Sequence, residues 1–419
     1  MEGWRTVRLG DVCDLIKRGI APKYTENDGI PVVNQKCIRN HKIDFSLSRY
    51  HDLSRKKVPQ DRMILPGDVL VNSTGVETLG RVAQVGEVLS CPATVDTHVT
   101  IVRPQKNLFV QSFFGYAMIF LEGEIASSGK GASGQIELAR TALAENFKIT
   151  YPQSFEEQQR IVSILEDAFT ALAKAKENTE RSCALSREFF ESELATLSSS
   201  KNVGWNTLPL GNVCEVIKRG IAPKYAETEG VSVINQKCIR NHKVNISLAR
   251  YHEDSKKKVP QEKIVLPGDV LVNSTGIGTL GRVAQVESFF THPTTVDTHV
   301  TIVRPKKNIF AQKFFGYAMI FLEREIALSG KGTSGQTELA RKALAEDFEI
   351  AYPPSLEDQQ RIAAKLDDLS SQTKALEEKY QHKLAALEEL KQSLLHRAFT
   401  GELTRNFRET ERQLSEVGA

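Results

Sequence analysis

The sequence predicts an α+β fold in which two repeated mixed α/β domains are joined by two long helices. We expect these helices to pack as an antiparallel coiled coil with pseudo-two-fold symmetry. The first observation is an internal repeat: Gly3-Trp4 recurs as Gly204-Trp205, and the same offset of 201 residues continues without a gap. The second is a long segment without Gly or Pro at the end of each copy, with apolar residues at alternating steps of four and three. Such spacing is typical of a helix packed against a partner helix.

The repeat consists of whole domains. The runs that recur almost unchanged are Ile16–Tyr24 as Ile217–Tyr225, Asn34–Lys42 as Asn235–Lys243, Leu65–Gly75 as Leu266–Gly276, and Val95–Pro104 as Val296–Pro305. Copies of about 200 residues are tandem domains rather than solenoid units. We therefore predict a first domain at 1–153, a long helix at 154–200, a second domain at 201–354, a second long helix at 355–400 and a tail at 401–419. Within that tail, Arg405–Ala419 is polar.

Composition describes an ordinary soluble protein. The 419 residues are 40% hydrophobic and 26% charged, and the net charge of +3 means that any nucleic-acid role must come from local basic patches. No apolar run approaches the roughly 18 residues of a membrane span, and the N-terminus lacks the apolar core of a signal peptide. The six cysteines form no C-x-x-C pair, which favours reduced thiols. We expect a cytoplasmic protein that does not bind a membrane.

Within each copy the pattern is mixed. In the first, we predict short strands at Ile64-Leu65, Asp68–Val71, Arg81–Val85 and His98–Val102, a helix at Leu108–Leu121, a Gly-rich loop at Ser128–Gln135, a short helix at Ile136–Ala144 and a strand at Phe147–Pro152. The aromatic residues of the Leu108–Leu121 helix have the spacing of core residues rather than of a stacking platform.

The first long helix is predicted over Ser154–Leu197. It opens with acidic residues, and its seam is Ile161, Leu165, Ala168, Leu172, Ala175 and Thr179. The second, from Ser355, keeps the same rhythm through four heptads, interrupted only by Lys383, beside which Leu384 can cover the seam.

Motifs for catalysis are missing. In Gly129-Lys130-Gly131 the lysine stands at the wrong end for a nucleotide phosphate loop. Cys37 and His41 lack two further ligands at metal-binding spacing. Pro66-Gly67-Asp68 resembles the start of a nuclease strand, but no Glu-x-Lys follows it, and there is no Asn-Pro-Pro-aromatic motif for base methylation. We expect neither a catalytic site nor a metal site.

Basic residues interleaved with amides favour nucleic acid instead. Arg can bond guanine, Asn and Gln can bond adenine, and Lys can contact phosphates; the competing interpretation is a solvated charged face. The candidates in the first copy are Lys17, Arg18, Lys23, Tyr24, Asn34, Gln35, Lys36, Arg39, Asn40, His41, Lys42, Asn72, Ser73, Thr74 and Lys130. Their counterparts are Lys218, Arg219, Lys224, Tyr225, Asn235, Gln236, Lys237, Arg240, Asn241, His242, Lys243, Asn273, Ser274, Thr275 and Lys331.

Several of these motifs, in this order and twice over, carry a resemblance to a known family. They are Trp4–Val12 with Trp205–Val213, Leu65–Leu70 followed by Ser73-Thr74-Gly75, Leu79–Ala83, Tyr151–Ile161 at the start of the long helix, and the ending Ser393–Leu403. Over nearly its full length the chain resembles the specificity subunit of type I restriction–modification enzymes.

The resemblance implies two target recognition domains, each reading one half of a bipartite double-stranded DNA site, with the helices setting the distance between the halves. It implies two modification subunits that methylate with S-adenosylmethionine, and restriction subunits that use ATP and Mg. This subunit would be non-catalytic and would hold no cofactor itself.

The near-identity of the two copies departs from the family's usual pair of dissimilar domains. Two similar domains related by a two-fold axis should bind similar half-sites in inverted orientation, so we predict an interrupted palindrome. The alternative is that differences such as Glu77 against Gly278, or Cys91 against His292, make the half-sites unlike. Two other interpretations stay open: a coiled-coil scaffold that does not bind DNA, and a cryptic nuclease or methyltransferase.

Overall fold

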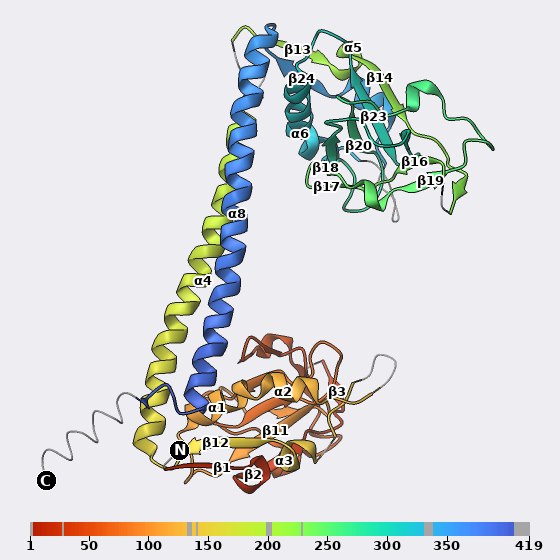
Figure 1. Cartoon of the computed structure of the whole chain (residues 1–419). Helices are drawn as coiled ribbons and strands as arrows, with labels where there is room; N and C mark the ends of the chain where they lie inside the picture. The colour runs from red at the N-terminus through yellow and green to blue at the C-terminus, as the bar shows by residue number, and fades with distance from the viewer. Residues whose placement is uncertain are drawn as a thin grey trace, which may run out of the picture. The chain divides into compact units, whose positions relative to one another are not determined.

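The computed structural model describes residues 3–26, 29–131, 136–139, 141–197, 203–227, 229–330 and 338–405. Its chain divides into two compact units, Met1–Thr179 with His382–Ala419, and Glu180–Gln381. Each unit holds one copy of the repeat and a part of each long helix (Figure 1). Most of the predicted polar tail, residues 406–419, lies outside the described residues.

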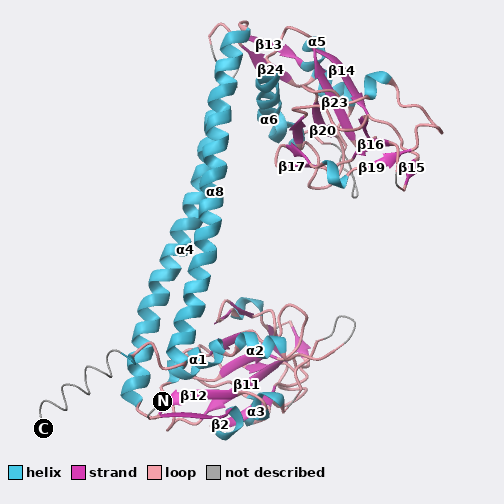
Figure 2. Ribbon diagram, in the orientation of Figure 1, coloured by secondary structure: helices cyan, strands magenta, loops and turns pink. Residues whose placement is uncertain are grey.

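Two four-stranded sheets form the first copy (Figure 2). The first sheet is antiparallel in the order β2 (Cys13–Arg18), β11 (Val99–Pro104), β8 (Val69–Asn72), β9 (Val82–Gln84). The second has the order β10 (Thr94–Val95), β4 (Ile30–Val33), β7 (Arg49–His51), β3 (Tyr24–Thr25). Two further pairs are β1 (Trp4–Arg8) with β12 (Lys148–Pro152), and β5 (Ile38–Arg39) with β6 (Lys42–Ile43); the helices are α1 (Gln111–Phe120), α2 (Glu122–Ser127) and α3 (Ala142–Glu145).

The first sheet is buried on both faces. Successive side chains of a strand point to opposite faces, and β8 shows the consequence. Val69 and Val71 join the core cluster that contains Phe113 and Met118 of α1, whereas Leu70 joins a second cluster with Val95 of the other sheet. The copy is therefore layered, with helix on one side of the first sheet and the second sheet on the other.

The second copy repeats this arrangement in its own unit. Its sheets are β14 (Cys214–Arg219), β23 (Val300–Pro305), β20 (Val270–Asn273), β21 (Val283–Gln285), and β15 (Tyr225–Ala226), β19 (Arg250–His252), β16 (Val231–Ile234), β22 (Thr294–Val296). The pairs are β13 (Asn206–Pro209) with β24 (Glu349–Tyr352) and β17 (Ile239–Arg240) with β18 (Lys243–Val244); the helices are α5 (Leu210–Val213), α6 (Gln312–Leu328) and α7 (Arg341–Glu346).

The long helices are α4 (Phe155–Leu197) and α8 (Leu356–Phe399), and each begins one residue after its predicted start. In the first unit the end of α8 packs on the copy, where the ring of Phe399 lies 5.4 Å from that of Phe113. In the second unit Arg187 Nε lies 2.5 Å from Glu377 Oε1 and Lys365 Nζ lies 3.1 Å from Glu193 Oε2. From the first of these pairs to the second, the residue number rises in α4, from 187 to 193, and falls in α8, from 377 to 365. The helices therefore run antiparallel. This confirms the predicted pairing of the helices.

Some predicted elements differ in the structure. Ile64-Leu65 is not a strand. The helix predicted from Leu108 begins only at Gln111, because the amide of Gln158 in α4 binds the Leu108 carbonyl at 2.9 Å and the Val110 N–H at 2.7 Å. These contacts fix the stretch before α1, and Val110 has an extended backbone.

The short helix predicted over Ile136–Ala144 is also wrong in its first half, since the helix spans only Ala142–Glu145. Glu137 instead forms isolated bridges with Thr74 and with Lys130. All six cysteines of the chain are free.

Candidate nucleic-acid interface

Several predicted site residues meet at one edge of the first copy. β2, β4 and β8 end there and β11 begins there, because Val99 of β11 is paired with Asn72 of β8. We call the side chains gathered at this edge the polar cluster: Gln35, Asn72, Thr74, Thr78 and His98. The pairing of the strands, rather than closeness in sequence, brings these residues together.

Hydrogen bonds connect the polar cluster throughout. The Thr74 hydroxyl lies 2.8 Å from His98 Nδ1. The hydroxyls of Thr74 and Thr78 lie 3.4 and 3.3 Å from Gln35 Oε1. Asn72 Nδ2 donates to the Gln35 carbonyl at 3.0 Å. His98 is exposed, and its Nε2 has no hydrogen-bond partner among the described residues, so it is available to a ligand.

The second copy places the same residue types together, Gln236, Asn273, Thr275, Thr279 and His299, but there the Thr279 hydroxyl donates to the Thr275 carbonyl and Gln236 Oε1 has no partner among the described residues. Thr275 Oγ1 lies 2.7 Å from His299 Nδ1, and Asn273 Nδ2 donates to the Gln236 carbonyl at 3.1 Å. In both copies the buried side-chain oxygen of the asparagine, on Asn72 and on Asn273, has no partner among the described residues.

Not every predicted residue is at the surface. Asn72 and Ser73 are 0% and 1% exposed, and Asn273 and Ser274 have the same values. The Ser73 hydroxyl lies 2.5 Å from that of Thr100 on β11. In this conformation these four side chains stabilise the edge and offer no surface to DNA.

Arg18 and its counterpart Arg219 also act inside the fold. Arg18 binds the Glu137 carboxylate and the Leu138 carbonyl. Arg219 binds Glu338 at 2.5 Å and the Leu339 carbonyl at 2.6 Å. Each arginine thereby holds the segment after the Gly-rich loop against the edge. Lys130 is exposed on that loop, whereas Lys331 lies outside the described residues.

A two-residue turn presents the most basic run. Asn40 and His41 both have left-handed backbones, with φ of 50° and 59°, as a type I′ hairpin turn requires. We call Lys36–Lys42 the basic hairpin, and Lys237–Lys243 its counterpart. Lys36, Arg39, Asn40 and Lys42 are exposed. His41 is half-buried, with Nε2 2.9 Å from Glu122 of α2.

Asn34 precedes the basic hairpin and shapes it. Its Oδ1 accepts the Lys36 N–H at 2.9 Å, and its Nδ2 donates to the Leu47 carbonyl at 3.2 Å. The same two bonds recur at Asn235, with 2.9 and 3.3 Å. In both copies the amide of this residue is therefore already hydrogen-bonded within the protein, and its role is to stabilise the hairpin.

A second basic region surrounds Tyr24. The Arg49 guanidinium stacks 3.4 Å from the centre of the Tyr24 ring. Burial raises the pKa of the Tyr24 phenol, which keeps it neutral. His51 is fully buried: its Nδ1 accepts the Lys23 N–H at 2.9 Å and its Nε2 lies 2.7 Å from the Lys56 carbonyl. His51 therefore holds two basic loops together and is no part of the exposed surface.

Lys17 carries an ion pair of its own. Its Nζ lies 2.8 Å from Asp61, and Lys218 lies 3.4 Å from Glu262 in the second copy. Both pairs are about half exposed, so they restrain the lysines weakly. Lys23 and Lys224 are exposed.

Sequence reasoning missed His98 and Thr78. Both stand in stretches that the repeat copies, but their place in the polar cluster depends on strand pairing. The described part of the chain contains no group of three or more side chains that could hold a metal ion. Nor does any helix in it have the length and apolar character needed to cross a membrane.

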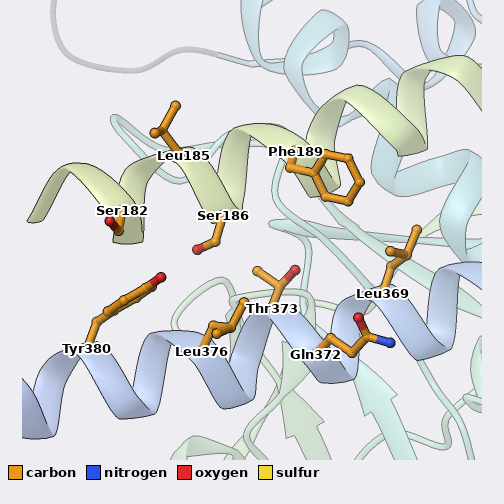
Figure 3. Close-up of a pocket in the computed structure, with 9 residues that line it drawn as sticks. All are labelled: Ser182, Leu185, Ser186, Phe189, Leu369, Gln372, Thr373, Leu376 and Tyr380. Carbon is orange, nitrogen blue, oxygen red and sulfur yellow. The ribbon is translucent and has the colours of Figure 1, made fainter. Parts of the chain in front are cut away.

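The paired helices of the second unit carry an apolar hollow of about 390 Å³ (Figure 3). Side chains of both helices line it: Ser182, Leu185, Ser186, Phe189, Leu369, Gln372, Thr373, Leu376 and Tyr380. Leu185 and Phe189 are 52% and 56% exposed, which is unusual for large apolar side chains along a helix seam.

Comparison with known proteins agrees with this architecture. The model of the type I restriction modification DNA specificity domain matches residues 1–180 and again 202–386. The chain is 21% identical to the type I restriction enzyme EcoKI specificity subunit of Escherichia coli (strain K12), over 97% of this chain and 90% of that protein. It is 22% identical to the StySPI specificity subunit of Salmonella potsdam, with the same coverage.

Solved structures share the fold. A structure of a type I R-M system covers 96% of this chain and 99% of its own, with 23% identity and a TM-score of 0.76. The HsdS subunit from Thermoanaerobacter tengcongensis covers 96% of this chain and 98% of its own, with 23% identity and a TM-score of 0.56. The family model matches both copies, the two copies have equivalent sheets with the same polar edge, and the long helices are paired. The chain therefore belongs to the family of type I restriction–modification specificity subunits.

Proposed function

We propose that each copy reads one half of a bipartite site in double-stranded DNA, and that the two halves are alike and inverted. The observation that supports this most is the basic hairpin, which has the same seven residues in both copies, Lys36–Lys42 and Lys237–Lys243, and exposes its Lys and Arg side chains beside the edge. Exposed Lys and Arg suit phosphates and guanine, and the glutamine amide and threonine hydroxyls of the polar cluster suit base edges.

Binding to duplex DNA at rising salt concentration tests this function. Phosphate contacts release counterions, so affinity should fall steeply with salt. A scaffold without DNA affinity would show no such binding. Replacing Arg39 and Arg240 together by Ala should weaken binding or relax the choice of target.

The control for that pair is Lys106→Ala with Lys307→Ala. These lysines are exposed and follow β11 and β23 at the strand end opposite the polar cluster. Unchanged affinity and unchanged target in the arginine variant would remove the basic hairpin from the interface. Mapping of methylated bases in the genome tests the palindrome, which two unrelated half-sites would contradict.

The helices have a separate role in this proposal. They set the spacer between the half-sites and bind two modification subunits, which carry S-adenosylmethionine, while restriction subunits use ATP and Mg. The exposed apolar hollow around Phe189 supports binding of a partner subunit by the paired helices, because large exposed apolar surfaces mark interaction sites. Phe189→Ala should weaken binding of a modification subunit without changing the half-sites.

Spacer length has its own test. Removing one heptad from α4 and one from α8 should shorten the spacer in the methylated motif and leave both half-sites unchanged. An unaltered spacer would contradict this role and would show that the helices only link the two domains.

A further inference from the structure

The two polar clusters are made of the same five residue types, but the turn that carries them differs at one charged position. Glu77 in the first copy corresponds to Gly278 in the second, between residues that are otherwise alike: Ser-Thr-Gly before, and Thr-Leu-Gly-Arg after. The only other change in the turn is Val76 to Ile277, which exchanges one exposed aliphatic side chain for another.

The turn holds position 77 beside the polar cluster. The Leu79 N–H donates to the Gly75 carbonyl at 3.0 Å, and Arg81 Nη2 donates to the Glu77 carbonyl at 3.0 Å. The next residue, Thr78, is itself a member of the cluster. The second copy repeats the Arg bond at 2.9 Å, from Arg282 to Gly278. An arginine therefore binds the carbonyl of this position in both copies, although Gly278 has a left-handed φ of 71° and Glu77 has no positive φ.

The Glu77 side chain is exposed, and its carboxylate has neither an ion-pair nor a hydrogen-bond partner among the described residues. A carboxylate near DNA is repelled by phosphates and can only accept hydrogen bonds. In the major groove the exocyclic amino group of cytosine, N4, is the donor that Glu takes. Gly278 offers no side chain at all.

We propose that Glu77 is a specificity-determining residue of the first copy. It accepts a hydrogen bond from a cytosine amino group in one half-site. At the matched position of the other half-site, Gly278 selects no particular base. The half-sites are then alike and inverted except at this base. This inference rests on the proposed DNA-reading function, and the experiment separates the two.

The test uses the full chain with its partner subunits in a host without other methylation, and reads the methylated motif by sequencing. Wild type should show one cytosine that has no counterpart in the other half. Glu77→Gly should lower discrimination at that base by about fivefold or more, so that the two half-sites become the same. Glu77→Gln, which keeps the size and removes the charge, should also lose the preference for cytosine.

The matched control is Glu87→Ser, which likewise exchanges an exposed carboxylate of the first copy for the residue of the second, Ser288. It should leave the motif unchanged. The reciprocal Gly278→Glu is a weaker probe, because Gly278 has φ of 71°, a left-handed conformation that costs about 1 kcal/mol or more for a side chain.

A motif that persists unchanged in both Glu77 variants would overturn the inference. So would a shift of the motif by Glu87→Ser instead. Failure of the wild-type assembly to methylate any bipartite site would count against the proposed function itself.

Discussion

The buried pair of Asp68 and Arg103 is the sharpest point at which to test the fold that supports the site. Asp68 is 1% exposed; its Oδ1 lies 2.7 Å from Arg103 Nε and its Oδ2 lies 2.8 Å from Nη2. The Leu65 N–H donates to the same carboxylate at 2.7 Å. The pair joins the start of β8 to the end of β11, and β8 carries the chain to the polar cluster.

Asp68→Asn keeps the shape and removes the charge. Breaking a buried ion pair typically costs about 3–5 kcal/mol, because the remaining charge is left buried and without a partner. Arg103 retains 20% of its side-chain exposure and a bond of 2.9 Å to the Met63 carbonyl. We therefore expect the low end, about 3 kcal/mol, which corresponds to a fall in Tm of roughly 6–12 °C for a unit of this size.

Hydrogen exchange of the β8 and β11 amides, measured by peptide, reports on the first unit separately from the second. The amides should open more easily in Asp68→Asn, and the double variant with Arg103→Met should recover most of the loss, since it leaves no unpaired buried charge. Asp61→Asn, at the exposed pair with Lys17, is the control and should cost less than about 1 kcal/mol. A loss below about 1 kcal/mol in Asp68→Asn, or additive effects in the double variant, would refute the reasoning.

Further predictions concern buried groups of the first unit. His51→Ala should cost about 2–4 kcal/mol in urea unfolding, because it leaves the Lys23 N–H and the Lys56 carbonyl unpaired and opens a cavity; a cost near zero would contradict this. Burial raises the pKa of Asp96, so the stability that this group contributes is present below its ordinary pKa and is lost as pH rises through the raised value. Asp96→Asn should therefore gain stability relative to wild type as pH rises above the ordinary carboxyl pKa, measured by urea unfolding at each pH, and a constant difference would count against it. Phe399→Ala should cost about 3–5 kcal/mol in thermal unfolding, because the ring packs against the aromatic rings of α1.

The long helices were predictable because their signal is local. Spacing of apolar residues over more than 40 positions, without Gly or Pro, predicted the starts of α4 and α8 within one residue. The hairpin of β5 and β6 carries a weaker signal, since Asn40-His41 places two residues with side chains in left-handed conformations where Asn-Gly is the usual pattern. The segment at Glu137 was misjudged as helical because a long-range bridge to Thr74, together with a bridge to Lys130, outweighs its local propensity.

The candidate site was predictable in residue type but not in exposure. Asn72 and Thr74 stand two positions apart in one polar run, yet only Thr74 reaches the surface. The difference arises because Asn72 is the last residue of β8 and is paired with Val99, which buries it. Since the register of β8 on β11 depends on contacts distant in sequence, composition could not separate these two residues or add His98.

Folding explains only part of the identity between the copies. Arg18 keeps its identity at Arg219 because each binds an acidic residue after the Gly-rich loop. By contrast Lys36 and Lys42 are exposed and make no ion pair among the described residues, yet both are retained. Exposed positions beside them have changed, as Phe45 to Ile246 shows. The fold places no demand on these lysines, and their charge suits the DNA that we propose each copy binds.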